Sequence, residues 1–79
     1  MKDLLTKLIN LLVDDSTVAQ VNETVQENLH TLEITCNSDQ IGRIIGKGGH
    51  NIRALRTLMN IKGITQNKQV MVKLLEPSL

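Results

Sequence analysis

Three of the five glycines in this 79-residue chain stand within four consecutive positions, residues 46–49, and Lys47 is the fourth member of the group. Glycine adopts backbone angles and permits close approaches that a side chain forbids, so such a group separates one helix from the next. The apolar residues on each side of it repeat at helical spacing; they are Ile41, Ile44 and Ile45, then Ile52, Leu55, Leu58 and Met59. We therefore predict a short helix that Gly46 ends, and a longer helix from Gly49 to about Gly63.

The N-terminal part of the chain carries one helical pattern and two strand patterns. Residues 2–13 form an amphipathic helix in this prediction, and the turn-forming residues 14–16 end it. Residues 17–26 and 31–36 alternate as strands, with a short reversal at residues 27–29 between them, and together they predict a hairpin. The apolar sides of the two strands are Ala19, Val21 and Val25, and Leu32, Ile34 and Cys36.

A third strand follows the longer helix. Val70, Val72 and Leu74 alternate with polar or more exposed neighbours, and Pro77 marks the end of the pattern. Ser38 is the expected N-cap of the short helix. The predicted order is α-β-β-α-α-β in one α+β domain of residues 1–79, with one layer of helices over one face of the sheet.

Composition narrows the possible binding chemistry. Of the residues, 41% are apolar and 22% charged, which is typical of a folded domain. Phe, Trp and Tyr are absent, so the core must consist of Leu, Ile, Val and Met. The same absence argues against an RNA-recognition motif or an OB barrel, because both stack bases on aromatic rings.

Charge and reactive side chains exclude several other classes. A net charge of +1 argues against broad electrostatic capture of duplex nucleic acid. Cys36 is the single cysteine and lies on an apolar strand face, so we expect a small buried residue and an intracellular, cytoplasmic protein. The two histidines, His30 and His50, do not suffice for a zinc site, and no cofactor is expected. No cluster of catalytic side chains stands out, so an enzyme is not expected. No apolar run is long enough to predict a membrane-spanning helix.

The glycine group has the chemistry of an anion site. The helix that begins at Gly49 directs free N–H groups and the positive end of its dipole toward the loop, and Lys47 adds a mobile charge. A Walker loop does not fit, because Gly42 and Gly46 enclose three residues instead of four. A dinucleotide fingerprint fails as well, because Asn51 stands where its third glycine is required.

Residues 44–52, Ile-Ile-Gly-Lys-Gly-Gly-His-Asn-Ile, resemble the pattern I/V-I-G-x-x-G-x-x-I of KH domains. The order of elements is similar to the type II, prokaryotic arrangement. Length, the leucine-rich first helix and the approach to the last strand at residues 67–68 resemble the bacterial KhpA family in particular. The resemblance implies a three-stranded mixed sheet in which the second strand is central and parallel to the last, and which helices cover on one face. Gly42 and residues 14–16 depart from the family pattern.

The resemblance also implies a site for single-stranded RNA in a groove between the glycine loop with its helices and the last strand. Gly46, Lys47, Gly48 and Gly49 track the RNA backbone in this hypothesis. Ile45 and Ile52 form an apolar floor for bases, which Ile41 extends, and His50 is a further candidate contact. Three arginines flank the motif as phosphate ligands, with Arg53 preferred; the other two are Arg43 and Arg56.

The same resemblance implies the partners. A single domain contacts few nucleotides, so we expect weak binding that pairing of domains strengthens, as a homodimer or with a KhpB-like protein. The implied role is that of an RNA chaperone or a post-transcriptional regulator. Two alternatives remain open at this point, a protein-interaction module that retained the fold and an accessory factor in ribosome maturation.

Overall fold

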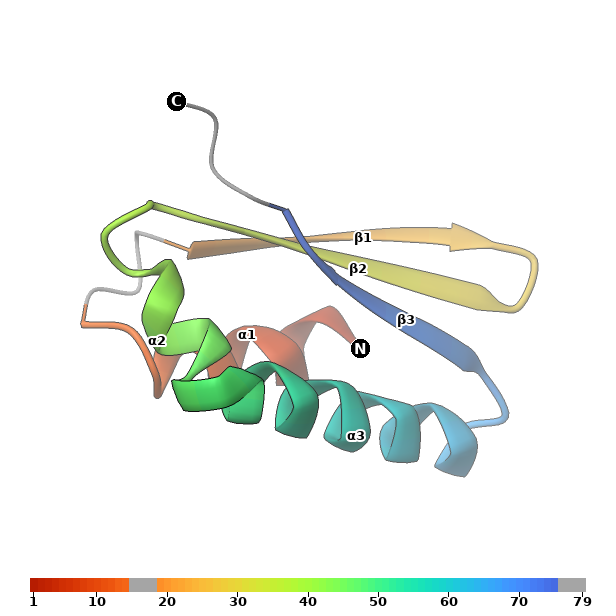
Figure 1. The fold of residues 1–79 in the computed structure, drawn as a ribbon. Helices are drawn as coiled ribbons and strands as arrows, with labels where there is room; N and C mark the ends of the chain where they lie inside the picture. The colour runs from red at the N-terminus through yellow and green to blue at the C-terminus, as the bar shows by residue number, and fades with distance from the viewer. Residues whose placement is uncertain (15–18, 76–79) are drawn as a thin grey trace.

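The computed structural model describes residues 1–14 and 19–75. Its elements are α1 (Lys2–Asn10), β1 (Ala19–Gln26), β2 (Leu29–Cys36), α2 (Ile41–Ile45), the 3-10 turn η1 (Lys47–Gly49), α3 (His50–Thr65) and β3 (Gln69–Leu74), as shown in Figure 1. The predicted order α-β-β-α-α-β is confirmed, with η1 inserted between the two consecutive helices. Within the described residues, no helix has the length and apolar character needed to cross a membrane.

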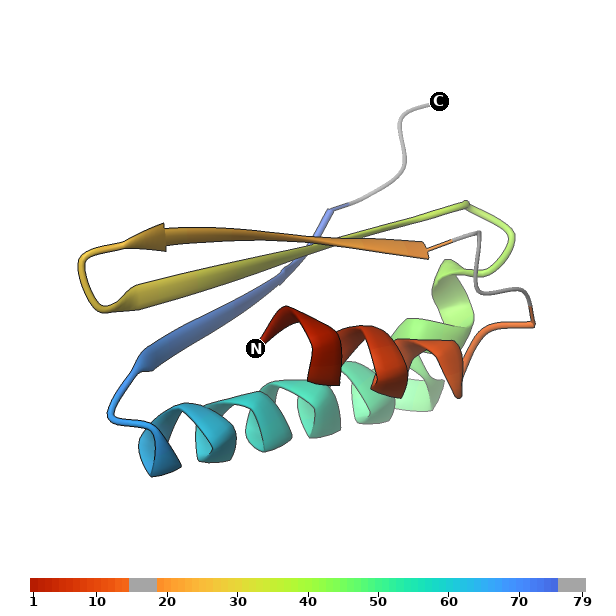
Figure 2. The same ribbon diagram turned by 180° about the vertical axis from the view of Figure 1, so that it is seen from behind.

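The sheet is mixed, and β2 lies at its centre. β1 pairs antiparallel to β2 through a tight hairpin, and β3 pairs parallel to β2 on the other side. A parallel neighbour requires a crossover connection, which α2 and α3 provide. In Figures 1 and 2, α1 and α3 lie side by side on the same face of the sheet. The predicted three-stranded mixed sheet with helices on one face is confirmed.

The core lies between this helical layer and the sheet. Alternate residues of β2 face the helices, and Leu32 and Ile34 are fully buried there. The other fully buried large side chains are Leu5, Ile9, Ile44 and Met59. Each contributes about 1.5–3 kcal/mol when buried. Cys36 is 8% exposed and belongs to the same cluster, as expected for a small buried side chain.

α1 ends at Asn10, so the predicted end at Val13 is wrong by three residues. The amide N–H of Leu12 donates to the Ile9 carbonyl at 2.8 Å, which tightens the chain into a turn. The turn brings Val13 into the core at 8% exposure and leaves Leu11 81% exposed. The periodicity of the leucines continues through the turn, which explains why the pattern extends past the helix.

The hairpin also departs from the prediction. The turn consists of Glu27 and Asn28, because Leu29 already pairs with Gln26. Val25, expected on the apolar side, is 55% exposed. In Figure 1 the hairpin end extends past the start of α1. Residues 15–18, which include the first part of the predicted strand, and Pro77 lie outside the described residues.

The short helix α2 begins without a side-chain cap. Ser38 is not its N-cap, because the helix starts at Ile41 and Gln40 takes the N-cap position. The carbonyl of Asn37 instead accepts the N–H groups of Gln40 and Ile41 at 3.1 and 3.0 Å. A main-chain turn therefore replaces the expected serine cap.

α3 continues to Thr65, past the predicted end at Gly63. Gly63 is buried where the end of α3 packs against the start of β3. A Cβ added there would lie 2.7 Å from both the Lys68 carbonyl oxygen and Cγ2 of Val70. The glycine permits this contact and does not stop the helix.

We predict that Gly63→Ala lowers the free energy of unfolding by about 1–3 kcal/mol, because the methyl group displaces β3. Gly42→Ala in α2 is the matched control, since a Cβ at Gly42 meets nothing within 4 Å. The control should stabilise the protein by about 0.5–1 kcal/mol. Urea unfolding monitored by circular dichroism measures both, and equal effects of the two substitutions would contradict the assigned contact.

A polar pair lies on the helix-covered face of the sheet, close to the start of α1. Nδ1 of His30 and Oε2 of Glu23 are 2.7 Å apart, and both side chains are largely buried. The hydrogen bond to His30 is the main cause that lowers the pKa of the Glu23 carboxyl below its usual value, and the positive charge of the N-terminus adds to it. Partial burial acts in the opposite direction and is outweighed. The pair therefore joins β1 to β2 on the helix-covered face.

A lowered carboxyl pKa contributes stability that is present above the unfolded value and is lost as the pH falls through the folded value. Glu23→Gln should therefore destabilise the protein at neutral pH, and the difference from the unmodified chain should shrink as the pH falls below about 4.5. Thermal unfolding across this pH range measures the difference. Glu33→Gln on the opposite face of the sheet is the control, and an equal pH dependence there would refute the role of the pair.

Candidate nucleic-acid interface

The glycine loop separates α2 from α3 as predicted, and three of its residues adopt positive φ. Gly46 has φ 75° and ψ 168°, a combination essentially limited to glycine. Gly48 and Gly49 lie in the left-handed region, with φ of 63° and 78°. Side chains at these positions would strain the turn, so the glycines are required by its backbone geometry.

The loop uses part of its own hydrogen-bonding capacity. The Gly49 N–H donates to the Gly46 carbonyl at 3.0 Å, and the His50 N–H donates to the Lys47 carbonyl. The N–H groups of Lys47 and Gly48 donate to no main-chain carbonyl in the part of the chain that the structure describes. Both residues are exposed.

These two N–H groups lie directly before the N-terminus of the 16-residue helix α3. The dipole of such a helix favours negative charge at this end. The exposed ammonium of Lys47 adds a full positive charge beside them. The loop can therefore accept an anion such as a phosphate oxygen at its open amides.

The isoleucines around the loop divide between surface and core. Ile41 and Ile45 are partly buried and pack against the core from its edge, so each presents apolar surface beside the loop. Ile52 is 8% exposed and belongs to the core cluster with Ile44. Of the predicted floor, Ile41 and Ile45 offer more accessible surface than Ile52.

Arg53 and Arg56 lie on the accessible side of α3. A Cβ built on Gly49 would lie 3.6 Å from Nη1 of Arg53, so this guanidinium lies beside the loop. Nε of Arg56 donates to the Val72 carbonyl of β3 at 3.3 Å. Leu75 donates to the Ile34 carbonyl of β2, and Gln69 donates to the Asn28 carbonyl just before β2. By the alternation of a parallel ladder, Val72 therefore directs its carbonyl to the free edge. Arg56 therefore spans from α3 to the outer edge of β3.

Arg43 occupies a different position. Its Nη2 forms an ion pair with Oδ2 of Asp14 at 3.1 Å, and the Asp14 N–H donates to Oε1 of Gln40 at 3.3 Å. These contacts connect α2 to the segment that follows α1. The structure thus brings Arg53 to the loop and gives Arg43 a partner within the protein.

Sequence reasoning missed Asn51. The motif assigns no residue type to this position, yet Nδ2 of Asn51 donates to the Arg43 carbonyl at 2.8 Å. Its side chain also lies against Gly46. A short amide side chain in the first turn of a helix is a signal for a main-chain contact, but its partner is eight residues away and only the folded loop shows it.

The element order, the parallel pairing of β2 with β3 and the glycine loop between α2 and α3 define a KH domain of the type II arrangement. A solved structure of Aquifex aeolicus Era is similar, with a TM-score of 0.60 at 15% identity. The match covers 92% of this chain and 28% of the Era chain, so it supports the fold alone.

A family model described as "KhpA/KhpB, KH domain" matches residues 2–74, and the chain belongs to this family. The RNA-binding protein KhpA of Clostridium perfringens is 33% identical over 75 residues, which cover 95% of this chain and all of the relative. The RNA-binding protein KhpA of Chlamydia caviae is 36% identical and covers 96% of this chain and 97% of its own. The predicted resemblance is confirmed. These relatives are named as RNA-binding proteins and not as enzymes, in agreement with the expectation for this chain.

Proposed function

We propose that residues 1–79 act as one KH domain that binds single-stranded RNA in the cytoplasm. The observation that carries the proposal is the pair of amide groups of the exposed residues Lys47 and Gly48, placed directly before α3, which donate to no main-chain carbonyl among the described residues. Its second support is the family, whose relatives are named for RNA binding.

In this proposal a phosphate approaches the main chain of Gly46, Gly48 and Gly49. Its oxygens accept hydrogen bonds from the open N–H groups of Lys47 and Gly48, and the Lys47 side chain neutralises its charge. Arg53 binds a neighbouring phosphate from the side of α3. Arg56 and the free edge of β3 bound the far side of the groove.

Ile45, with Ile41 and the accessible part of Ile52, contacts the unstacked bases in the proposed groove. Arg43 and His50 are outer contacts. Main-chain contacts to phosphate carry little sequence information, so affinity should be modest and tolerant of sequence.

Replacing both Lys47 and Gly48 with aspartate should abolish RNA binding and leave the fold intact. The two carboxylates repel phosphate at the open amides, and aspartate tolerates the positive φ of position 48 better than most residues. A Cβ at Gly48 meets nothing within 4 Å. Fluorescence anisotropy with short mixed-sequence single-stranded RNA measures affinity, and circular dichroism measures the fold.

The matched control replaces Lys68 and Gln66 with aspartate. It changes the net charge of the protein by the same amount as the loop variant, but at the far end of α3. It should retain most of the affinity at moderate salt. Unchanged binding by the folded loop variant would refute the proposed grip. A protein that binds no RNA at all, and captures proteins or ribosomal particles instead, would favour the interaction module or the ribosome-maturation factor.

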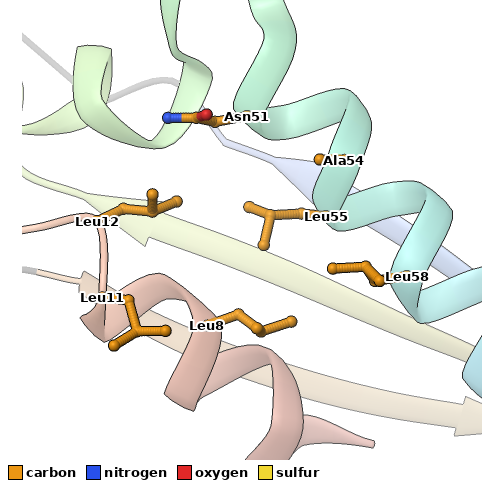
Figure 3. Close-up of a pocket in the computed structure, with 7 residues that line it drawn as sticks. All are labelled: Leu8, Leu11, Leu12, Asn51, Ala54, Leu55 and Leu58. Atoms are coloured by element: carbon orange, nitrogen blue, oxygen red, sulfur yellow. The ribbon is translucent and has the colours of Figure 1, made fainter.

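We further propose that the domain works in pairs, preferably with a second copy of itself. Leucines of α1, of the turn after it and of α3 line two adjoining hollows of about 190 and 270 Å³. Figure 3 shows the first of them. Leu8 and Leu58 line both, and Leu58 is 47% exposed. Pairing raises the effective concentration of the second RNA site without new contacts to RNA.

Leu58→Glu should convert a dimer to a monomer, because it places a charge in the centre of this surface. Light scattering after size-exclusion chromatography measures the mass. Val25→Glu, with the same charge on the exposed hairpin, is the control and should remain dimeric. A monomeric unmodified protein at high concentration would contradict self-pairing and direct the search to a KhpB-like partner.

RNA annealing and strand-exchange assays address the cellular role. We propose a chaperone or post-transcriptional regulator of the KhpA type. A KH domain that holds backbone phosphates leaves bases accessible for pairing, which suits either role. Loss of annealing activity in the Lys47 and Gly48 double variant, with normal activity in the Lys68 and Gln66 control, is the expected result.

A further inference from the structure

Asn51 connects the two helices that flank the glycine loop. It lies in the first turn of α3, and its side-chain amide points toward α2 in Figure 3. α2 has five residues, too few to be stable alone. What holds its last turn therefore determines where the loop begins.

The last carbonyls of a helix lack partners within the helix. In α2, the Gly42 carbonyl accepts the N–H of Gly46 at 2.8 Å. The next carbonyl, that of Arg43, accepts Nδ2 of Asn51 at 2.8 Å. A side chain from α3 thus completes the C-terminal end of α2 across the loop.

The same side chain lies against the first loop residue. A Cβ built on Gly46 would lie 2.7 Å from Cγ and 2.9 Å from Cβ of Asn51. Gly46 therefore fits between α2 and Asn51 only in the absence of a side chain, at φ 75° and ψ 168°. Asn51 contacts both the end of α2 and the start of the loop.

We infer that Asn51 is the positioning residue that presets the direction of the open N–H groups of Lys47 and Gly48. The inference rests on the proposed RNA function of these groups. Asn51 acts through its hydrogen bond to Arg43 and not by contact with RNA. Holding the loop in its bound form before RNA arrives reduces the ordering cost of binding.

Asn51→Leu tests this role, because leucine has a similar branched shape and no donor or charge. Asn60→Leu is the matched control, since Asn60 is exposed on the same helix. RNA affinity is measured by anisotropy with the same mixed-sequence single-stranded RNA, at a temperature where each variant is fully folded. Backbone amide resonances in ¹⁵N NMR spectra report the loop independently of RNA.

We expect Asn51→Leu to weaken RNA binding about threefold to tenfold, the effect of one hydrogen bond of typical strength. The resonances of residues 46–49 should shift or broaden, and those of β2 should remain in place. Asn60→Leu should change neither. Asn51→Ser, whose hydroxyl is too short to reach the Arg43 carbonyl, should reproduce the result and serves if the leucine variant does not fold.

Unchanged loop resonances with unchanged affinity would overturn the inference. So would a loss of affinity with unchanged loop resonances, since Asn51 would then not act by positioning the loop. If the unmodified protein binds no RNA, the proposed function fails, and the loop resonances still decide whether Asn51 positions the loop.

Discussion

β3 pairs with β2 in parallel, and the rest of the molecule follows from that pairing. The chain must return along the sheet before β3 can form, and the returning segment must cover one sheet face to bury its apolar side. α2 and α3 do so with Ile44 and Met59, both fully buried. The turn between them is therefore held at one end of the sheet with its outer side toward solvent.

This arrangement allows a sparsely bonded loop to keep one conformation. The loop itself contributes few contacts, and two of its N–H groups donate to no main-chain carbonyl of residues 1–14 and 19–75. Its ends belong to helices that are anchored in the core. Asn51 of α3 joins these two helices, because its Nδ2 donates to the Arg43 carbonyl of α2 at 2.8 Å. Rigidity is thus supplied by the neighbours of the loop, and the loop is left free to bind an anion. The contacts of Asp14 to α2 extend the same support to the segment after α1.

The periodic patterns predicted the three α-helices and the three strands, but not the turn η1, because burial of one face imposes a period on any helix or strand. Their ends were less predictable. Val13 continues the leucine pattern but reaches the core through a turn, and Gly63 reads as a helix end but is a contact with β3. Val25 has the right spacing for the core but is 55% exposed, in a hairpin whose end extends past the start of α1. Each error depends on a contact, or a missing contact, with residues that are distant in the sequence and therefore outside the local pattern.

The features of the candidate site also divide into those that adjacent residues determine and those that depend on the fold. The glycines of residues 46–49, Lys47 and the flanking isoleucines are adjacent in the chain, so the sequence by itself determined the loop, its charge and the family it resembles. The tertiary structure alone decided that Arg56 reaches the Val72 carbonyl of β3, that Arg43 pairs with Asp14, and that Asn51 holds the end of α2. These partners are separated along the chain, and distances between such residues exist only after the sheet and its crossover have formed.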